Sequence, residues 1–199
     1  MNAGDPLRSN DSASGRREAL VRAAFDLIAA QGFENLRTRD VAGRVGINVA
    51  TLHYYFPTKQ ALVAAVAQSL ASGFETLRAP GAAAASPVAR LRQEFADTRL
   101  YLTEAPEMIA VMRELMARAA RDPEIAQVIE PLKQAWRRSL QDIIEDGAAQ
   151  GVFSTAMPSA EAAAVLVALL WGAATFPLNV NELLSAQAAV EAWLAPNTP

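Results

Sequence analysis

The sequence predicts an all-α protein of about nine helices, with a three-helix helix-turn-helix domain at the N-terminal end and a larger helical bundle after it. Apolar residues recur at helical spacing along most of the chain, and Gly, Pro and capping residues mark the breaks between the periodic stretches. No stretch shows the alternating pattern of a strand. With 199 residues, 52% of them hydrophobic, the chain is long enough to bury a sizeable core.

The N-terminal 14 residues predict a disordered basic arm. They mix Ser, Asn, Asp and Gly and lack the apolar core of a secretory signal peptide, so we expect a cytoplasmic protein. Arg8 is interpreted as part of a solvated tail; the alternative is a contact with DNA phosphates or the minor groove, which Arg16 and Arg17 beside the arm could also make. The first helix is expected over Arg16–Ala30, and Gln31-Gly32-Phe33 marks its exit.

The next helix is expected to begin at Thr38 and to run for about two turns. Thr38 is a suitable N-cap, and Asp40 suits the positive end of the helix dipole. Val41, Ala42 and Val45 then share one face. Gly46 follows where a helix ends through a left-handed residue.

A second short helix follows this turn. We expect Ile47 to fill the angle between the two helices, Asn48 to cap the second one, and Leu52 with Phe56 to form its buried face. The remaining side chains then point outward or toward the flanks: Val49, Ala50, Thr51, His53, Tyr54 and Tyr55. Two short helices around a glycine turn predict a helix-turn-helix, which places its second helix in the major groove of DNA.

The rest of the chain is read as a series of helices. The predicted helical ranges are Lys59–Leu77, Val88–Thr103, Pro106–Ala120, a start at Asp122-Pro123, Leu132–Gln150, Ser159–Pro177 and Asn181–Ala195. Residues 79–87 predict a loop, in which Ser86-Pro87 caps the following helix. Pro131 predicts a break or kink before Leu132, and Gly151 ends that helix.

The stretch from Ala162 to Leu178 carries no charge, and its apolar residues surround the whole helix. Such a helix is buried in protein or in lipid. A membrane span is not favoured, because the run is short, rich in alanine, ends at Pro177 and lacks flanking Lys or Arg. Ala168, Gly172 and Ala173 are small enough for close helix approach, so a homodimer is expected.

Charge is unevenly distributed along the chain. Residues 1–60 hold eight Lys or Arg against six Asp or Glu, a net charge of +2, and residues 61–199 carry −5, for a total of −3. No basic residue follows Arg138. The C-terminal end is therefore expected to face away from nucleic acid. The chain has no cysteine and a single histidine, so no disulfide framework, no His/Cys metal cluster and no thiol, zinc or serine–histidine enzyme are expected. We expect a protein that is not an enzyme and that needs no cofactor.

One segment resembles a known family closely. The residues Thr38-Arg39, Val41-Ala42, Gly46-Ile47, Thr51-Leu52, Tyr54-Tyr55-Phe56-Pro57, Lys59 and Leu62 are similar to the DNA-binding domain of the tetracycline-repressor (TetR) family of bacterial transcription regulators. The resemblance covers residues 14–64 closely and the rest in architecture. It implies domains at 15–62 for DNA binding and 63–199 for ligand binding and dimerisation, with residues 1–14 as the arm.

The resemblance also implies roles in DNA binding. Arg39, Val49, Ala50 and Thr51 match base-reading positions, and the Arg39 fork suits guanine while the apolar groups suit thymine methyls. The capping Asn48 is counted with the DNA-binding residues. The positions that mostly hold phosphates are Thr38, His53, Tyr54, Tyr55 and Lys59.

His53 departs from the family pattern, in which this position is usually tyrosine. One interpretation is that a neutral imidazole replaces a phenol as a hydrogen-bond donor. The other is that the ring becomes charged in mild acid and strengthens a phosphate contact.

For the remainder of the chain the resemblance implies a small-molecule pocket and a four-helix dimer interface. The candidate pocket residues, which would suit a largely apolar effector, are Phe95, Tyr101, Leu102, Met108, Met112, Met116, Trp136, Leu140, Leu166 and Trp171. The interface candidates are Ala168, Gly172, Ala173, Phe176, Leu183, Val190 and Leu194. No buried charge is identified as a ligand anchor, because Arg99, Arg113 and Glu114 could equally be solvated.

We therefore expect a repressor that binds a near-palindromic operator as a dimer and is released by a small ligand. Two alternatives remain open: a ligand-independent dimeric regulator, and, in a different class, a helical small-molecule-binding protein or enzyme with a vestigial DNA-binding head. Sequence-selective and salt-dependent binding to a short palindrome separates the first class from the last.

Overall fold

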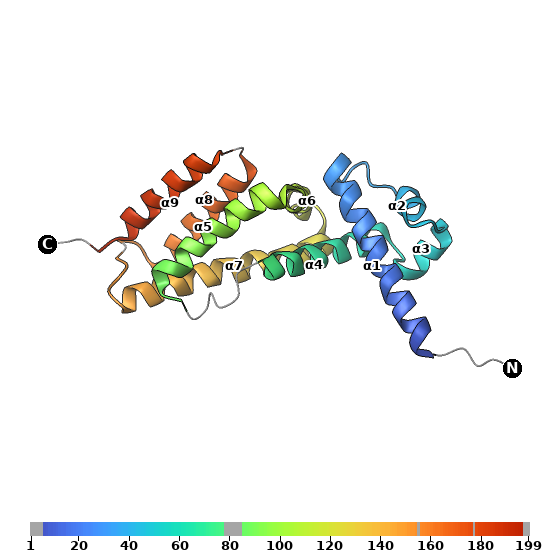
Figure 1. The fold of residues 1–199 in the computed structure, drawn as a ribbon, viewed down its shortest axis with the longest axis horizontal. Helices are drawn as coiled ribbons and strands as arrows, with labels where there is room; N and C mark the ends of the chain where they lie inside the picture. Colours follow the sequence, from blue (N-terminus) through green and yellow to red (C-terminus); the bar gives the residue numbers. More distant parts are fainter. Residues whose placement is uncertain (1–5, 78–84, 155, 177, 197–199) are drawn as a thin grey trace. The chain divides into compact units, whose positions relative to one another are not determined.

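The computed structural model describes the backbone of residues 6–77, 85–154, 156–176 and 178–196, and side chains from residue 13 to 74 and from 85 onward within these ranges. Over this part of the chain the structure contains nine α-helices and no strand, which confirms the all-α prediction (Figure 1). The helices are α1 (Pro6–Gln31), α2 (Thr38–Val45), α3 (Val49–Tyr55), α4 (Lys59–Leu77), α5 (Pro87–Glu104), α6 (Pro106–Ala119), α7 (Pro123–Ala149), α8 (Ser159–Thr175) and α9 (Val180–Leu194).

The first helix begins earlier than the sequence predicts. Helix α1 starts at Pro6, so the expected disordered arm over residues 1–14 is corrected for residues 6–14. Proline is well suited to the first turn of a helix, and the polar residues that follow it weaken a helix without forbidding one. Residues 1–5 and the Arg8 side chain lie outside the described part of the structure.

The chain divides into two compact units. The first contains the residues up to Ser72 together with Ala110–Ile129, and the second contains Gly73–Ile109 and Glu130–Pro199. These units divide the chain at other positions than the predicted functional boundary at residue 62, which stays a prediction. Residues 110–129 join the first unit because their side chains bind its loops: Glu114 accepts a hydrogen bond from the backbone N–H of Phe33 at 3.0 Å.

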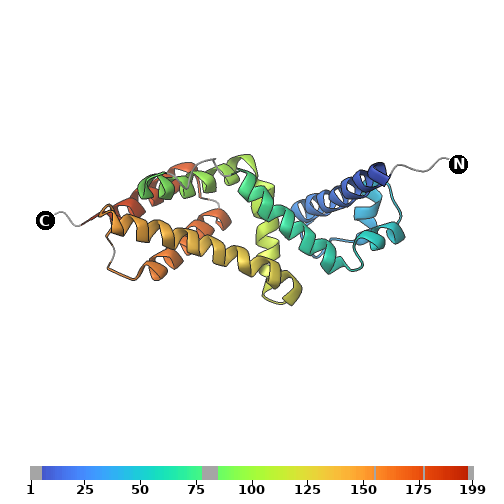
Figure 2. The same cartoon turned by 90° about the horizontal axis from the view of Figure 1, so that it is seen from below.

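The core of the first unit is built from α1, α2, α3 and the beginning of α4, which Figure 2 shows gathered together. Its fully buried side chains include Leu20, Ile28, Val41, Leu52, Phe56, Leu62 and Val66. Leu52 and Phe56 form the buried face of α3, as predicted. Burying these large side chains fixes the short α3, which seven residues of helix could not stabilise alone.

The turn between α2 and α3 follows the prediction at Gly46 and departs from it at Thr38. Gly46 adopts the left-handed conformation with φ of 72°, and the N–H of Ile47 donates to the carbonyl of Ala42 at 3.0 Å. Thr38 is the first helical residue rather than the cap. The cap position is Arg37, and no side chain caps this end. The Thr38 hydroxyl could have accepted a backbone N–H as a cap does. Thr38 already has helical backbone geometry, however, so the cap position falls one residue earlier.

The second unit has a core formed by α5, α7, α8 and α9, which run alongside one another in Figures 1 and 2. The buried side chains include Leu91 and Phe95 of α5, Leu140 and Ile144 of α7, Leu166 and Leu170 of α8, and Leu183 and Leu194 of α9. Ion pairs link the outer edges of these helices, since Arg90 pairs with Asp146 and Arg92 with Glu191. Within the described residues, none of the helices has the length and apolarity needed to cross a membrane.

Pro131 lies inside a continuous helix, so of the two expected alternatives, a break or a kink before Leu132, the break is wrong. Helix α7 runs from Pro123 to Ala149 with Pro131 within it. A proline removes the hydrogen bond to the carbonyl four residues earlier, here that of Gln127. Gln127 and Pro131 are both exposed, so water can hydrate the Gln127 carbonyl. The packing of the rest of α7 keeps the helix continuous.

Candidate nucleic-acid interface

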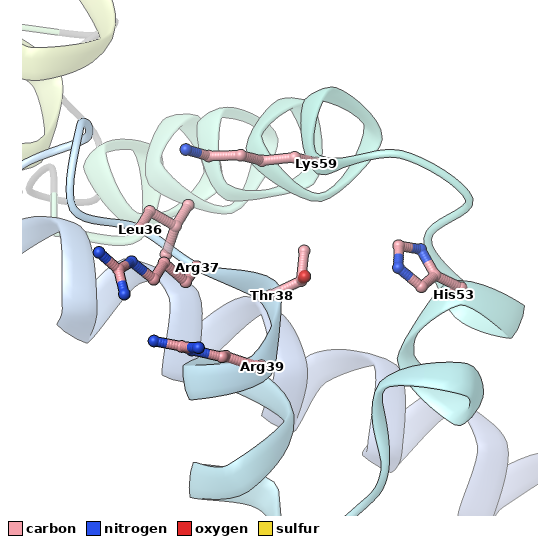
Figure 3. Close-up of a pocket in the computed structure, with 6 residues that line it drawn as sticks. All are labelled: Leu36, Arg37, Thr38, Arg39, His53 and Lys59. Carbon is pink, nitrogen blue, oxygen red and sulfur yellow. The ribbon is translucent and has the colours of Figure 1, made fainter.

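A concave surface of the first unit collects basic and hydrogen-bonding side chains. It is lined by Leu36, Arg37, Thr38, Arg39, His53 and Lys59 (Figure 3). These residues come from the loop before α2, the start of α2, the middle of α3 and the first residue of α4. In Figure 3 the charged ends of Arg37, Arg39 and Lys59 extend in the same direction, while His53 lies across from them on α3. Such a grouping of cations and hydroxyl suits an anion such as a phosphate.

Arg37 was missed by the sequence reasoning. It is exposed and directly precedes Thr38 and Arg39. Its positive charge at this place in the sequence could have indicated a phosphate contact. Arg39 is also exposed, and its Nε lies 3.5 Å from the Asp40 carboxylate. Contact with one edge of the guanidinium leaves the two terminal nitrogens able to bind a base edge or a phosphate.

The cap of α3 holds its first turn as predicted. The side-chain oxygen of Asn48 accepts hydrogen bonds from the backbone N–H of Thr51 at 2.8 Å and from the Thr51 hydroxyl at 3.0 Å. These two bonds fix the rotamer of Thr51. The neighbouring Ala50 is exposed and Val49 is half-buried, so a compact and mostly apolar tip faces outward.

Two aromatic rings follow this tip on α3. Tyr54 is 82% exposed, so its ring and its hydroxyl are accessible for a contact. Its ring meets that of the half-buried Tyr55 edge to face, with centroids 5.3 Å apart. The two phenol hydroxyls belong to the same helix as His53, and each is a suitable donor to a phosphate oxygen.

Lys59 lies deeper than the sequence suggested. Its Nζ donates to the backbone carbonyl of Phe33 at 3.4 Å and stands 4.6 Å from the centre of the Phe33 ring. Partial burial lowers the pKa of Lys59; the Glu34 carboxylate raises that pKa and the Arg118 guanidinium lowers it. The cap of α4 is the preceding residue, Thr58, whose hydroxyl accepts from the N–H of Ala61.

All ten predicted DNA-binding residues therefore lie in the first unit, on α2, on α3 with its cap, or at the start of α4. They are Thr38, Arg39, Asn48, Val49, Ala50, Thr51, His53, Tyr54, Tyr55 and Lys59. Four of them line the concave surface: Thr38, Arg39, His53 and Lys59. Their roles in binding DNA remain predictions.

The predicted pocket residues are not all brought together. Phe95, Leu140 and Leu166 form part of one buried cluster in the second unit, against which Leu102 and Trp136 pack. Tyr101 donates its hydroxyl to the carbonyl of Phe74 and Met108 is buried, also in the second unit, and Trp171 is half-buried there. Met112 and Met116 belong to the first unit, so the candidate pocket residues are divided between the two units.

A buried acidic group in the second unit was also missed. Glu94 and Asp97 of α5 are only 8% and 4% exposed. The carboxylate of Glu94 accepts a hydrogen bond from the indole N–H of Trp136 at 2.8 Å, and that of Asp97 accepts one from Gln93 at 2.7 Å. Buried carboxylates are rare, so the expectation that no buried charge would stand out is wrong. Glu114, considered as an anchor, instead binds the Phe33 backbone in the first unit.

The predicted interface residues separate into two groups. Ala173, Leu183, Val190 and Leu194 are buried in the second unit's own core, so they do not face a partner chain as expected. Ala168 and Phe176 are exposed and Gly172 is half-buried. The exposed Val165, which was missed, Ala168 and Gly172 repeat at intervals of three or four along α8 and form one outward face, and Phe176 follows as the C-cap of this helix. Val180 and Leu184 of α9 are exposed as well.

Family models match most of the chain in two segments. Residues 20–66 match the model described as bacterial regulatory proteins, tetR family. Residues 87–195 match the model described as BetI-type transcriptional repressor, C-terminal. The second segment alone covers more than half of the 199 residues.

Individual relatives agree with these models. The chain is 38% identical over 55 residues to the class C tetracycline repressor protein of Escherichia coli, covering 28% of this chain and 25% of the relative. It is 30% identical over 126 residues to the transcriptional regulator BetI of Rhizobium meliloti, covering 63% of this chain and 62% of the relative. The chain thus covers less than two thirds of the length of either relative.

Solved structures share the fold. A transcriptional regulator of Saccharomonospora viridis in complex with choline has a TM-score of 0.82 at 22% identity, covering 92% of this chain and all of that one. A TetR transcription regulator from Haloarcula marismortui has a TM-score of 0.73 at 21% identity, covering 91% and 97% of the two chains.

Proposed function

The chain belongs to the TetR family of bacterial regulatory proteins, and from this premise we propose that it is a cytoplasmic transcriptional repressor, not an enzyme. In this proposal a homodimer binds a near-palindromic operator through the first unit of each subunit, and a small molecule bound in the second unit releases it. The observation that carries the proposal is the concave basic surface beside the exposed tip of α3.

The arrangement supports a division between positioning and reading. Arg37, His53 and Lys59 offer charged or polar groups for phosphates, which fix the protein on the duplex without reading sequence. The small tip of Ala50 and Thr51 can approach base edges closely, and Arg39 can reach guanine. Because the tip is largely apolar, we expect operators in which thymine methyls carry part of the specificity.

The test is selection of operator sequences from random DNA, followed by binding measurements on the selected duplex. We expect nanomolar affinity for a short palindrome, with log affinity falling by about 0.9 per log unit of salt for each phosphate neutralised. Thr51→Arg should abolish selectivity, and Lys59→Ala should weaken binding uniformly and reduce the salt slope by about 1. Weak binding that ignores sequence would favour the alternative of a small-molecule-binding protein or enzyme with a vestigial DNA-binding head.

His53 calls for a separate comparison. Operator affinity should be measured from mildly acidic to mildly basic pH for the wild type and for His53→Tyr. A steeper gain in acid for the wild type supports a charged phosphate contact. Parallel curves support the neutral donor interpretation.

The outward face of α8 supports the proposed dimer. Val165, Ala168, Gly172 and Phe176 lie along it, and Phe176 is 71% exposed. Val165→Glu should convert the dimer to a monomer in sedimentation experiments, because it places a charge within an apolar contact. The matched control is Val152→Glu, at an exposed valine outside α8, which should leave the dimer intact.

The buried acidic group bears on the effector. Glu94, Trp136 and the surrounding apolar core favour a ligand that joins an apolar body to a cationic or donor group, rather than a purely apolar one. The choline complex of the Saccharomonospora viridis protein supports this class. Choline and related ammonium compounds should therefore be tested first for release of the operator, with neutral isosteres as controls. If no member of a wider metabolite panel releases DNA, the ligand-independent regulator is favoured.

A further inference from the structure

Phe33, in the loop after α1, is surrounded by charged groups of the first unit. Its ring is 5% exposed, and the Lys59 ammonium and the Arg118 guanidinium lie 4.6 and 4.8 Å from its centre. Its backbone N–H is held by Glu114 of α6 and its carbonyl by Lys59. We call Phe33, Glu34, Lys59, Glu114 and Arg118 the Phe33 cluster.

The acidic groups near the cluster differ in how firmly they are held. Glu114 accepts the buried N–H of Phe33, and Asp122, which is 9% exposed, accepts from the backbone N–H of Glu124 at the start of α7. Glu34, in contrast, has a side chain that is 83% exposed, and it pairs with the Arg118 guanidinium at 3.2 Å. Glu34 is therefore the carboxylate best able to change partner.

Two cations compete for Glu34. In this structure Glu34 forms an ion pair with Arg118. Lys59 donates a hydrogen bond to the Phe33 carbonyl instead, and the charge of Glu34 raises the pKa of Lys59. Lys59 also lines the concave surface where we place a DNA phosphate. If Arg118 were removed, Glu34 would gain Lys59 as its remaining cationic partner, and a lysine paired with a carboxylate is a poorer partner for phosphate.

We propose that Arg118 is a positioning residue for DNA binding: by holding Glu34, it leaves the Lys59 ammonium available to the operator. The proposal rests on the proposed function, because the partner of Lys59 is then a DNA phosphate. It gives α6 an electrostatic role in operator affinity, through a carboxylate that exchanges between two cations, although no α6 residue lines the concave surface.

The experiment is a double-mutant cycle on the full chain, using Arg118→Gln, Glu34→Gln and the two together, with affinity measured on the selected operator. Arg118→Gln should weaken binding about fivefold, the scale of one surface ion pair. Adding Glu34→Gln should restore most of that loss, and the gain from Glu34→Gln should be larger in this background than in the wild type.

Arg22 offers a matched control for the loss of an arginine. Its guanidinium also lies over a ring, 5.4 Å from the centre of Phe25, and it pairs with Asp26. In the Arg22→Gln background, Glu34→Gln should have the same effect as in the wild type. Equal effects of Glu34→Gln in the Arg118→Gln and wild-type backgrounds would overturn the proposal, because a purely packing role for Arg118 predicts additivity.

A second measurement needs no DNA. Titration of Lys59, followed by the ¹³C shift of its side chain, should show that Glu34→Gln lowers the Lys59 pKa more in the Arg118→Gln background than in the wild type, because Glu34 raises that pKa and would act on it most strongly once it pairs with Lys59. Equal shifts in the two backgrounds would also overturn the exchange. If the wild type selects no operator, the proposed function fails by itself, while the titration still decides whether Glu34 exchanges.

Discussion

The two units place their polar side chains in opposite ways. In the first unit, Arg37 and Arg39 stand exposed on a concave surface above a separate apolar core. In the second unit, Glu94 and Asp97 are buried among the helices and share their surroundings with that unit's core. Function and stability should therefore be separable by substituting the exposed polar residues of the first unit, and coupled at the buried polar residues of the second. Four sets of substitutions test this difference.

The largest effect is expected at Leu52, which is fully buried beneath α3. Leu52→Ala should lower the free energy of unfolding by about 2–5 kcal/mol and abolish operator binding, because the cavity removes the support of α3. Circular dichroism during heating measures the change. The control is Ala50→Ser, at an exposed residue of the same helix, which should change the free energy of unfolding by less than about 0.5 kcal/mol. A mild effect of Leu52→Ala would mean that α3 is held by other contacts.

A similar effect in the second unit is expected at Gly147. A Cβ on this residue would lie 1.9 Å from a ring carbon of Phe153. Gly147→Ala should therefore cost about 1–3 kcal/mol in the free energy of unfolding, as overpacked cores do. Gly43→Ala is the matched control, because Gly43 also lies inside a helix and a Cβ there meets nothing within 4 Å. It should stabilise α2 by up to about 1 kcal/mol, and the two variants can be compared by urea unfolding.

The most direct test of the comparison is Glu94. Glu94→Ala removes the acceptor of the Trp136 indole N–H. It should lower the free energy of unfolding by about 1–3 kcal/mol and abolish any response to an effector. Glu94→Gln keeps an acceptor oxygen and should retain more stability than Glu94→Ala. Arg39→Ala, in the first unit, should weaken operator binding without moving the melting temperature. If Glu94→Ala leaves stability unchanged, function and stability are separable in both units.

The smallest effect concerns an exposed pair of the second unit. Hydrogen bonds from Arg92 and then from Gln187 hold the pKa of Glu191 below its ordinary value. A carboxyl with a depressed folded-state pKa adds stability above the ordinary pKa of about 4.3, and this is lost as the pH falls through the folded value. Arg92→Gln should thus lower the melting temperature slightly at pH 7, and this difference should shrink as the pH is lowered below the ordinary pKa of a glutamate. A difference that persists in acid would show that Arg92 acts by packing.

Local signals predicted much of the first unit. Gly46 and Asn48 act on the residues beside them, so their roles as a left-handed turn and a helix cap follow from short stretches of sequence. Thr38 shows the limit of such reasoning, because its type fits a cap while the backbone places Arg37 there. The depth of Lys59 depends on Phe33, 26 residues away, and no local pattern contains that contact.

Burial in the second unit was harder to predict. Helix α8 is apolar on every side, so periodicity could not tell that Ala173 faces its own core while Phe176 faces outward. Glu94 looks like a surface residue in the sequence, and only the packing of α5 against α7 brings it to Trp136. Such facts depend on partners distant in the chain, which a single sequence does not specify.

The contact between Gly147 and Phe153 also has an evolutionary consequence. The ring fills the space that any side chain at position 147 would need, so neither position can change freely while the other is kept. Across related sequences the two positions should vary together, with a residue larger than glycine at 147 accompanied by one smaller than phenylalanine at 153. A lineage that altered one of them alone would pass through a less stable intermediate, and this short stretch at the end of α7 should therefore evolve slowly.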